Sequence, residues 1–497
     1  MKINPDSSSS SDSSYMNNNQ NVSSELLCKS GTKIDTYGAI QEPEYHTTEQ
    51  YIDPIIEEQL LRKLDLRMTA WGFFASFSNY LNRNNMQNAF TMGMDKDLNI
   101  DSAAYNLSVS IFFIGYTMLQ IPGNILITKT LPRLVLPSFA VIWSSVVCFM
   151  PLVKSHTALW PLRFILGLAE SPYYPGMMLL LGSWYKKEEL GKRNMLIASG
   201  IPVAGAIGGL IASGIAKTMD GAGGLPGWKW LFITEGIIGI LVGVSGYFLL
   251  PNFPHNTPWL TVEERRVAIA RMQNQGIHVI SNSYSWKTIT NVLMRPYPWL
   301  LIILWTCIII ALGLCDNIAI ILRDLDFPVA VANLMLTPLY IFGAVASILI
   351  GWSSDRTGDR AFHIAGTLLW VSIWYFILVV VNHGDNPATL VLVAAYAVNG
   401  NASTVSLCLA WLNEFFKTDH NSRAIAIGFI NTLGMVIPNI LNVKLWVVTD
   451  APTFRVGKLA GMSVGIIGMT VTILIWFLIR IDFMVPKPIN EQRRRIY

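Results

Sequence analysis

Hydrophobic residues along this chain gather into twelve runs of transmembrane length, separated by polar connections that are short except after the sixth run. A transmembrane α-helix needs about 20 apolar residues. Lipid-facing backbone permits only helices or closed barrels. We therefore expect an all-α integral membrane protein whose twelve transmembrane helices form two six-helix bundles. The expected spans are 69–90, 105–127, 134–153, 159–182, 195–216, 230–250, 298–322, 330–352, 363–381, 390–415, 424–448 and 459–479.

The polar segments predict five parts: a disordered cytosolic tail over 1–65, a bundle over 66–250, a cytosolic linker over 251–296, a second bundle over 297–480 and a short cytosolic tail over 481–497. The first tail opens with SSSSSDSS and similar stretches, too polar to bury a core. It has no apolar core of a signal peptide. In the linker, Thr261 followed by Glu264 predicts the capped start of an amphipathic helix.

Composition supports a polytopic membrane protein and excludes other classes. Charged residues make up 14% of the chain, against about 25% in soluble domains. The net charge of +4 is small and describes loop bias, so no nucleic-acid partner is expected. The cysteines lack zinc-like spacing, and the histidines lie in the tail, in loops or at helix ends. We expect no metal, no cofactor and no enzyme.

Basic residues concentrate in alternate connections, which fixes an expected orientation. By the positive-inside rule these connections, and with them both termini, are cytosolic. The residues concerned are Lys129, Arg133, Lys186, Lys187, Lys192, Arg193, Arg265, Arg266, Arg271, Lys287, Arg356, Arg360, Lys417 and Arg423.

The fourth span holds two charged residues, Arg163 and Glu170, in the stretch LRFILGLAESPYYPG. An ionisable side chain at mid-membrane costs about 2.5–3.5 kcal/mol even on the gentler scales, so such residues usually face a partner or a polar cavity. The two are seven residues apart, close to two turns, and therefore share one side of the helix. One interpretation is an anion contact at Arg163 and a proton carrier at Glu170; the other is an internal ion pair that holds helices together.

The second half carries GWSSDRTGDR at the end of its second span. A tight turn at Gly358, with Asp355, Arg356 and Arg360 in charge pairs, can lock or release neighbouring helix ends, so we assign these four residues to gating. An ordinary solvated turn is the alternative. The segment resembles the G-x-x-x-D-R-x-G-x-[RK] loop motif of the major facilitator superfamily.

Further segments resemble the allantoate permease branch of that superfamily, the anion:cation symporters common in fungi. They are FFIGYTMLQIPGNILI, RFILGLAESPYYPG, LGSWYKKEELGKR, GWKWLFITEG and LPNFPHNTPWLTVEER. The resemblance covers about 65–479. It implies import of a small carboxylate such as allantoate, nicotinate or pantothenate, generally with protons, and a plasma-membrane location, with the endoplasmic reticulum or vacuole as alternatives.

In the first span, NYLNRNNMQNA matches the family's Y-x-x-D-R-x-N-x-x-N-A, with Asn82 where an aspartate is usual. Without that aspartate, Arg83 loses its nearest neutralising partner and the cavity becomes more electropositive. Arg83 and Arg163 both lie on the outer side of their spans, so both guanidiniums can reach one carboxylate. The alternative places Arg83 at the outer headgroups. Asn79, one turn before Arg83, completes this set of substrate contacts.

Two carboxylic acids compete for the role of proton carrier. A nearby arginine and burial act in opposite directions on the protonation of Glu170, so substrate binding at the arginine can couple to it. Asp316, in the seventh span, is the rival, and Asn317 beside it is a further expected substrate contact.

We therefore expect a monomeric secondary transporter that imports a small organic anion with protons by alternating access. The alternative is a nutrient sensor of the same build that binds without transport. Such sensors usually carry a long signalling tail, and the segment after Ile479 is short.

Overall fold

In a computed structural model of the chain, twelve helical runs and no strand occur within the described residues, which are 52–274, 290, 292–381, 387–415, 420–447 and 450–480. This confirms the expected all-α fold of twelve transmembrane helices in two sets of six. The runs of the first half are α3 (Ala70–Ala89), α5 (Ser102–Lys129), α6 (Pro132–Phe149), α7 (His156–Glu170) with α8 (Tyr173–Gly182), α9 (Lys187–Ala198) with α10 (Gly200–Thr218), and α11 (Gly227–Leu249). Those of the second are α14 (Pro296–Ala311) with α15 (Gly313–Asp324), α16 (Val329–Leu334) with α17 (Leu336–Thr357), α18 (Ala361–Val380), α19 (Ala388–Asn399) with α20 (Ala402–Phe415), α21 (His420–Leu445), and α22 (Arg455–Arg480).

Eight of these runs, counted within the described residues, are long and apolar enough to cross a membrane by length and composition alone. The other four are α3, α5, α7 with α8, and α21. Each of the four has at least 20 helical residues, which at 1.5 Å per residue reaches the roughly 30 Å of a bilayer core. Among the four are α3 and α7, which contribute Arg83 and Arg163.

One break in an expected span lies beside a predicted site residue. We expected one helix over 159–182, but α7 ends at Glu170 and α8 begins at Tyr173. Pro172, at the start of α8, has no N–H, and its ring clashes with the carbonyl four residues earlier in a continuous helix. Glu170 therefore sits at a helix end within the span. Four other spans are likewise divided: α9 from α10, α14 from α15, α16 from α17, and α19 from α20.

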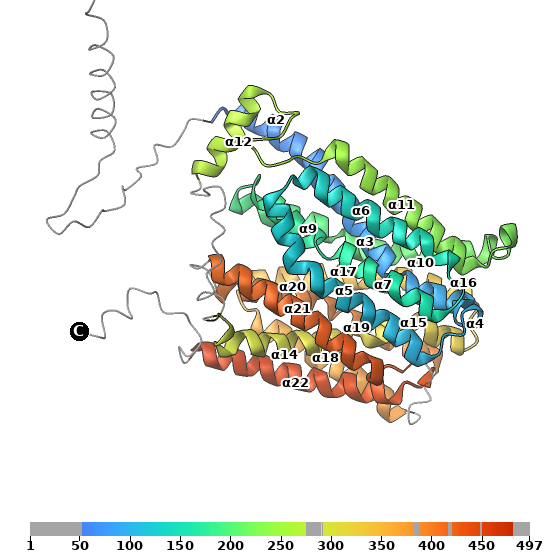
Figure 1. The fold of residues 1–497 in the computed structure, drawn as a ribbon. Helices are drawn as coiled ribbons and strands as arrows, with labels where there is room; N and C mark the ends of the chain where they lie inside the picture. Colours follow the sequence, from blue (N-terminus) through green and yellow to red (C-terminus); the bar gives the residue numbers. More distant parts are fainter. Residues whose placement is uncertain are drawn as a thin grey trace, which may run out of the picture. The chain divides into compact units, whose positions relative to one another are not determined.

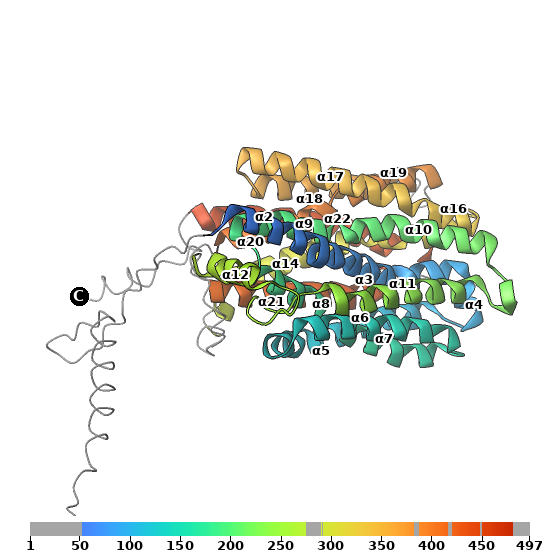
Figure 2. The ribbon, with the colours of Figure 1, turned by 90° about the horizontal axis from the view of Figure 1, so that it is seen from above.

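Most helix packing occurs within each half, and a smaller set of helix pairs joins the halves. In the first half, α5 packs on α7 and α6 on α11; in the second, α18 packs on α22 and α14 on α21. Between the halves, α10 packs on α16 and α17, and α5 on α21 (Figure 1). The α10–α17 pair is seen from above in Figure 2. Gly205 and Gly209 of α10 lie against the Tyr340 ring and the Asn333 carbonyl, so small residues allow this close approach.

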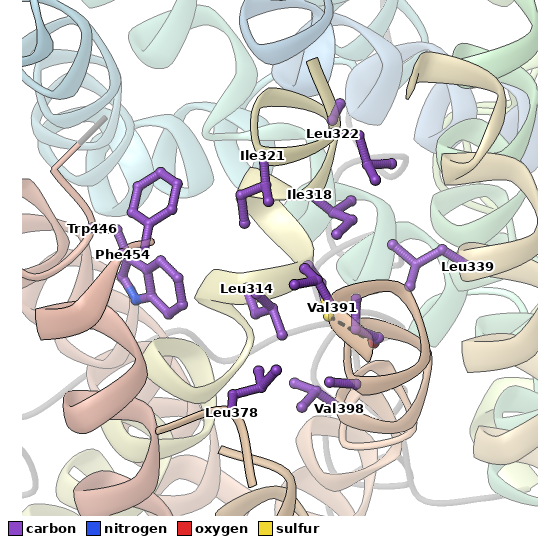
Figure 3. Packing of buried hydrophobic residues seen from close by; sticks show 14 of the residues in the cluster. Leu314, Ile318, Ile321, Leu322, Leu339, Leu378, Val391, Val398, Trp446 and Phe454 are labelled. Atoms are coloured by element: carbon purple, nitrogen blue, oxygen red, sulfur yellow. Dashed lines mark hydrogen bonds between the residues drawn. The ribbon is translucent and has the colours of Figure 1, made fainter. Parts of the chain in front are cut away.

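The interior of the second half includes two apolar clusters. In one of them, Leu314 and Ile318 of α15 pack with Val391 of α19, and Trp446 and Phe454 close the cluster (Figure 3). These five side chains are at most 2% exposed. The cluster fixes α15, the helix that carries Asp316.

The segment before the first span differs from the expected disordered tail. Residues 1–51 lie outside the described residues, but α2 (Pro54–Leu64) is helical, so the expectation of disorder up to residue 65 is wrong there. The Asp53 carboxylate caps α2 by accepting a hydrogen bond from the Ile55 amide at 2.9 Å. The residues 481–497, expected as a tail, also lie outside the described residues.

The linker helix α12 (Val262–Asn274) begins as predicted. The Thr261 amide donates to Glu264 Oε2 at 2.9 Å, and the Glu264 amide donates to Thr261 Oγ1 at 3.2 Å, which is the expected capping box. The helix packs on α2, and Lys63 pairs with Glu264 at 3.0 Å. We call the end of the membrane helices beside α2 and α12 the linker end, and the opposite end the far end.

Candidate functional site

Helix α3 directs polar side chains to two neighbouring stripes. Asn79 and Arg83 are four residues apart and form one stripe, while Ser78, Asn82 and Asn85 form the second. The three residues of the second stripe are at most 1% exposed. Burial of so many polar groups in one transmembrane helix needs partners in the neighbouring helices.

Arg83 forms an ion pair with Glu170. Its Nη2 lies 3.5 Å from Glu170 Oε2, and the Arg83 side chain is 23% exposed while that of Glu170 is fully buried. The guanidinium also lies over the rings of Phe112 and Tyr116 of α5, at 5.3 and 5.1 Å from their centroids. Arg83 therefore points into the protein interior. It does not extend to the lipid headgroups, which was the alternative drawn from the sequence. The expectation that Arg83 lacks a neutralising partner is wrong, because Glu170 takes the place of the missing aspartate.

Close packing of α7 on α5 brings Glu170 to these rings. A Cβ on Gly167 would overlap the Phe112 carbonyl, and one on Gly115 would overlap the Phe164 carbonyl. Only glycine permits this approach of two helix backbones. The crossing places Arg163 and Glu170, one turn to either side of Gly167, against the aromatic side chains of α5.

Arg163 is 2% exposed and has a neutral hydrogen-bond partner. Its Nη2 donates to Asn85 Oδ1 of α3 at 3.4 Å, and its Nε has no partner. The internal ion pair between Arg163 and Glu170, the alternative drawn from the sequence, is not formed. Both arginines act electrostatically on Glu170, and Asn79 lies beside that carboxyl. The structure thus brings Arg83, Arg163, Asn79 and Glu170 together.

Glu235 of α11 belongs to the same group, although the sequence analysis assigned it no role. Glu235 is 1% exposed, and neither of its carboxyl oxygens has a hydrogen-bond partner. Arg163 acts on it electrostatically, and the Asn85 side chain lies beside it. The signal was present in the sequence, because a lone acid inside the hydrophobic stretch GWKWLFITEG meets the same criterion that identified Arg163 and Glu170.

Asp316 lies apart from this group, in the first turn of α15. It is exposed, and it acts on Tyr80 and Tyr105 of the first half and on Tyr340 of the second. Asp316 therefore lies at the interface between the two halves. The Asn317 amide donates to the Gly313 carbonyl of its own helix at 2.8 Å. The structure thus gives Asn317 a local partner and does not bring it to Arg83.

The predicted gating loop forms its turn and one of its charge pairs. Gly358 ends α17 with φ of 68°, the left-handed conformation that the tight turn requires. Arg360 pairs with Asp355 at 2.5 Å, and the Asp355 side chain is 68% exposed. Arg356 lies over the Trp352 ring at 5.4 Å instead of joining a charge pair.

A small pocket opens on another face of α3, between α3, α10 and α17. Its lining includes Asn84, Gln87, Gly208 and Tyr340 and has no charged side chain. The lining therefore offers hydrogen-bond donors but no counter-charge for an anion. Among the described residues, no group of three His, Cys, Asp or Glu side chains is placed to hold a metal ion.

The chain is similar to known membrane transporters over most of its length. The sequence profile of the Major Facilitator Superfamily matches residues 72–437. The MFS-type transporter cnsO of Penicillium expansum is 30% identical over 436 residues, covering 85% of this chain and 83% of that protein. A putative tartrate transporter of Agrobacterium vitis is 28% identical, covering 76% of this chain and 82% of that protein.

Solved structures agree on the fold. An inward-facing, occupied bacterial homologue of the human lysosomal transporter Spinster matches with a TM-score of 0.64 and 13% identity, covering 85% of this chain and 97% of that one. A D-xylose–proton symporter matches with a TM-score of 0.61 and 14% identity, covering 82% and 97%. At such identities the likeness concerns the fold alone.

Proposed function

Since the chain belongs to the Major Facilitator Superfamily, and is therefore a multi-pass membrane transporter of a small molecule, we propose that its substrate is a small organic anion imported together with protons. The observation that carries this proposal is the Arg83–Glu170 ion pair, with Arg163 beside it, in the interior of the first half. Two guanidiniums in one polar site suit a carboxylate, which each can hold by parallel hydrogen bonds.

Competition for Arg83 couples the anion to the proton. When Glu170 is ionised, it occupies Arg83. When Glu170 takes up a proton, the Arg83 guanidinium is released to the substrate carboxylate, and the site gains one positive charge for one negative charge. Loss of the proton on the other side of the membrane restores the ion pair and displaces the anion. A buried carboxyl suits this exchange because an unpaired charge at membrane depth is costly.

The substrate has aromatic neighbours as well as charges. Phe112 and Tyr116 lie under the Arg83 guanidinium, and Tyr116 is partly exposed, so a planar or unsaturated substrate can contact this ring while its carboxylate meets the arginine. Nicotinate, allantoate and pantothenate remain the monocarboxylates to test. Tartrate joins them because a relative bears its name.

Alternating access requires contacts that form at one end and break at the other. At the far end, Arg323 of α15 pairs with Asp95 at 3.0 Å and donates to the Phe90 carbonyl at 3.0 Å. Asn333 donates to Thr91 at 3.0 Å beside it. We assign these contacts to the closed outer side, and the loop from Asp355 to Arg360 at the end of α17 to gating on the cytosolic side. In this proposal the protein works as a monomer in the plasma membrane with both termini cytosolic.

The experiment is uptake of the labelled panel of nicotinate, allantoate, pantothenate and tartrate by cells that express the protein at their surface. Faster uptake of one anion at acidic than at neutral external pH supports symport. No uptake of any member at either pH, with surface expression verified, would overturn the proposal for this substrate class and favour a sensor that binds without transport.

A further inference from the structure

Glu235 is a buried acid that the proposed exchange between Arg83 and Glu170 does not use. It lies on α11 in the middle of the first half, and both its carboxyl oxygens lack a hydrogen-bond partner. A structural glutamate at this depth would be expected to accept hydrogen bonds, because an unpaired buried polar group costs about 1–3 kcal/mol. The arrangement therefore needs another explanation.

Asn85 stands between Glu235 and Arg163. The Asn85 Oδ1 accepts from Arg163 at 3.4 Å, while its Nδ2 lies beside the Glu235 carboxyl without a hydrogen bond to it. The Nε of Arg163 has no partner either. Two donors and two acceptor oxygens thus lie close together and unsatisfied, so small side-chain rotations can connect Glu235 to Arg163 through Asn85.

The other surroundings of Glu235 are neutral. On α6, Cys148 lies against the neighbouring Gly236, and Ser144 lies against Gly239 one turn further on. Among the described residues, Arg163 is the charged group that acts on Glu235. The protonation of Glu235 is therefore tied to whether Arg163 needs a counter-charge.

The net charge of the site indicates what Glu235 can do. Arg83 and Arg163 contribute two positive charges, and Glu170 and Glu235 can contribute two negative ones. With both acids ionised the site is neutral without an anion. With Glu170 protonated, a proton on Glu235 would raise the site from one positive charge to two; a bound substrate anion lowers both counts by one, and the low dielectric of the interior makes this smaller charge less costly.

We propose that Glu235 is a second exchangeable acid of the site: it pairs with Arg163 through Asn85 when the arginine is free, and takes up a proton when an anion occupies the arginine. The only bond that changes is the O–H bond of the carboxylic acid, and the proton passes to water on the side to which the site is open. This inference rests on the proposed anion transport, which it extends by a second proton per cycle.

The first test needs no substrate. Infrared difference spectra of the purified full chain in lipid, recorded between acidic and neutral buffer, detect buried carboxylic acids by their C=O stretch. Glu235→Gln is expected to remove one band that the wild type shows, and Glu170→Gln a different one. Ser144→Ala, a neutral change beside α11, is the control and should leave both bands. A Glu235→Gln spectrum identical to that of the wild type would overturn the proposal, whatever the protein transports.

The second test measures proton and anion fluxes together in proteoliposomes, with whichever anion of the panel the wild type carries. Glu235→Gln is expected to retain anion exchange and to move one proton fewer per anion. An unchanged ratio would contradict the second proton. If Glu235→Gln does not fold, Glu235→Asp decides instead: its infrared band should move, and an unmoved band would contradict the proposal. Failure of the wild type to transport any anion would count against the proposed function and not against titration of Glu235.

Discussion

The two halves of the chain have the same number of helical runs, six each among the described residues, but different interiors. In the first half, Arg163, Glu170 and Glu235 are buried in the middle of helical runs. Among the described residues of the second half, the one buried charged side chain is that of Lys458, in the first turn of α22 at the far end, and the interior includes two apolar clusters. The first half thus holds the buried charges on which the proposed binding of an anion and a proton depends.

This difference explains why the helices of the first half depend on specific partners. Each buried charge is costly in a membrane, and it is tolerated because Arg83 meets Glu170 and Arg163 meets Asn85. Among the described residues, the centre of the second half has no buried charged side chain; apolar clusters lie there together with buried neutral polar residues such as Asn399 and Thr404. Substitutions should therefore affect transport in the first half and stability in the second.

The largest effect is expected from Arg83→Ala. It leaves Glu170 buried without its ion-pair partner, a loss of about 3–5 kcal/mol, and at about 1.4 kcal/mol per tenfold change it should lower uptake of the carried anion at least about a hundredfold. The control is Arg480→Ala, which also removes a guanidinium over an aromatic ring, 4.6 Å from Trp476, but at an exposed helix end. Equal losses in the two variants would show that the buried pair has no special role.

In the second half, Leu378→Ala should lower the free energy of unfolding by about 2–5 kcal/mol, because Leu378 is fully buried in the cluster with Leu314. Thermal denaturation of the purified protein measures this change. Anion exchange per folded molecule should stay at the wild-type level. Phe376→Ala, two residues away at an exposed position, is the control. A strong loss of exchange without loss of stability would remove the contrast between the halves.

The sequence was sufficient for the twelve spans because each is a long apolar run, and for Arg163 and Glu170 because charges stand out in such runs. The sequence did not reveal the pairing of Arg83 with Glu170. That pairing depends on how side chains of α3 and α7 come together beside α5. Helix α2 was missed because its first residues follow a polar tail, and its stability comes from contacts with α12 far along the chain.

A smaller effect is expected at the end of α17. Gly358→Ala places a Cβ on a residue with φ of 68°, where a non-glycine residue costs about 1–2 kcal/mol. Loss of the turn should slow transport more than it lowers stability, if the loop gates the cytosolic side. Gly366→Ala is the matched control, because Gly366 is helical and a Cβ there meets open space. Comparable transport rates in both variants would contradict the gating role.

The smallest effect concerns pH at the linker end. Burial raises the pKa of Glu57, but hydrogen bonds and charge from Lys186 and Arg271 outweigh it, so the net pKa lies below the ordinary 4.5. The pKa of Glu264 is likewise lowered, by the Thr261 amide and Lys63 acting against burial. Because both folded-state pKa values are lowered, their contribution is present above pH 4.5 and is lost as the pH falls through the lowered values.

These carboxylates are partly exposed, so the contribution of each pair should be under about 1 kcal/mol. Hydrogen exchange of the α2 amides should speed up at low pH in the wild type. Glu57→Gln should exchange faster already at neutral pH and change less on acidification. An α2 whose exchange is independent of both pH and Glu57 would show that these pairs do not hold it.

We propose that proton coupling depends on Glu170, with Glu235, in the first half and not on Asp316 of the second. The most direct measurement compares Glu170→Gln with Asp316→Asn in proteoliposomes, measuring both accumulation of the carried anion driven by a proton gradient and anion exchange without a gradient. We predict that Glu170→Gln strongly lowers accumulation and keeps exchange, while Asp316→Asn keeps both at the wild-type level. Loss of accumulation in Asp316→Asn, with Glu170→Gln accumulating as much anion as the wild type, would contradict this assignment.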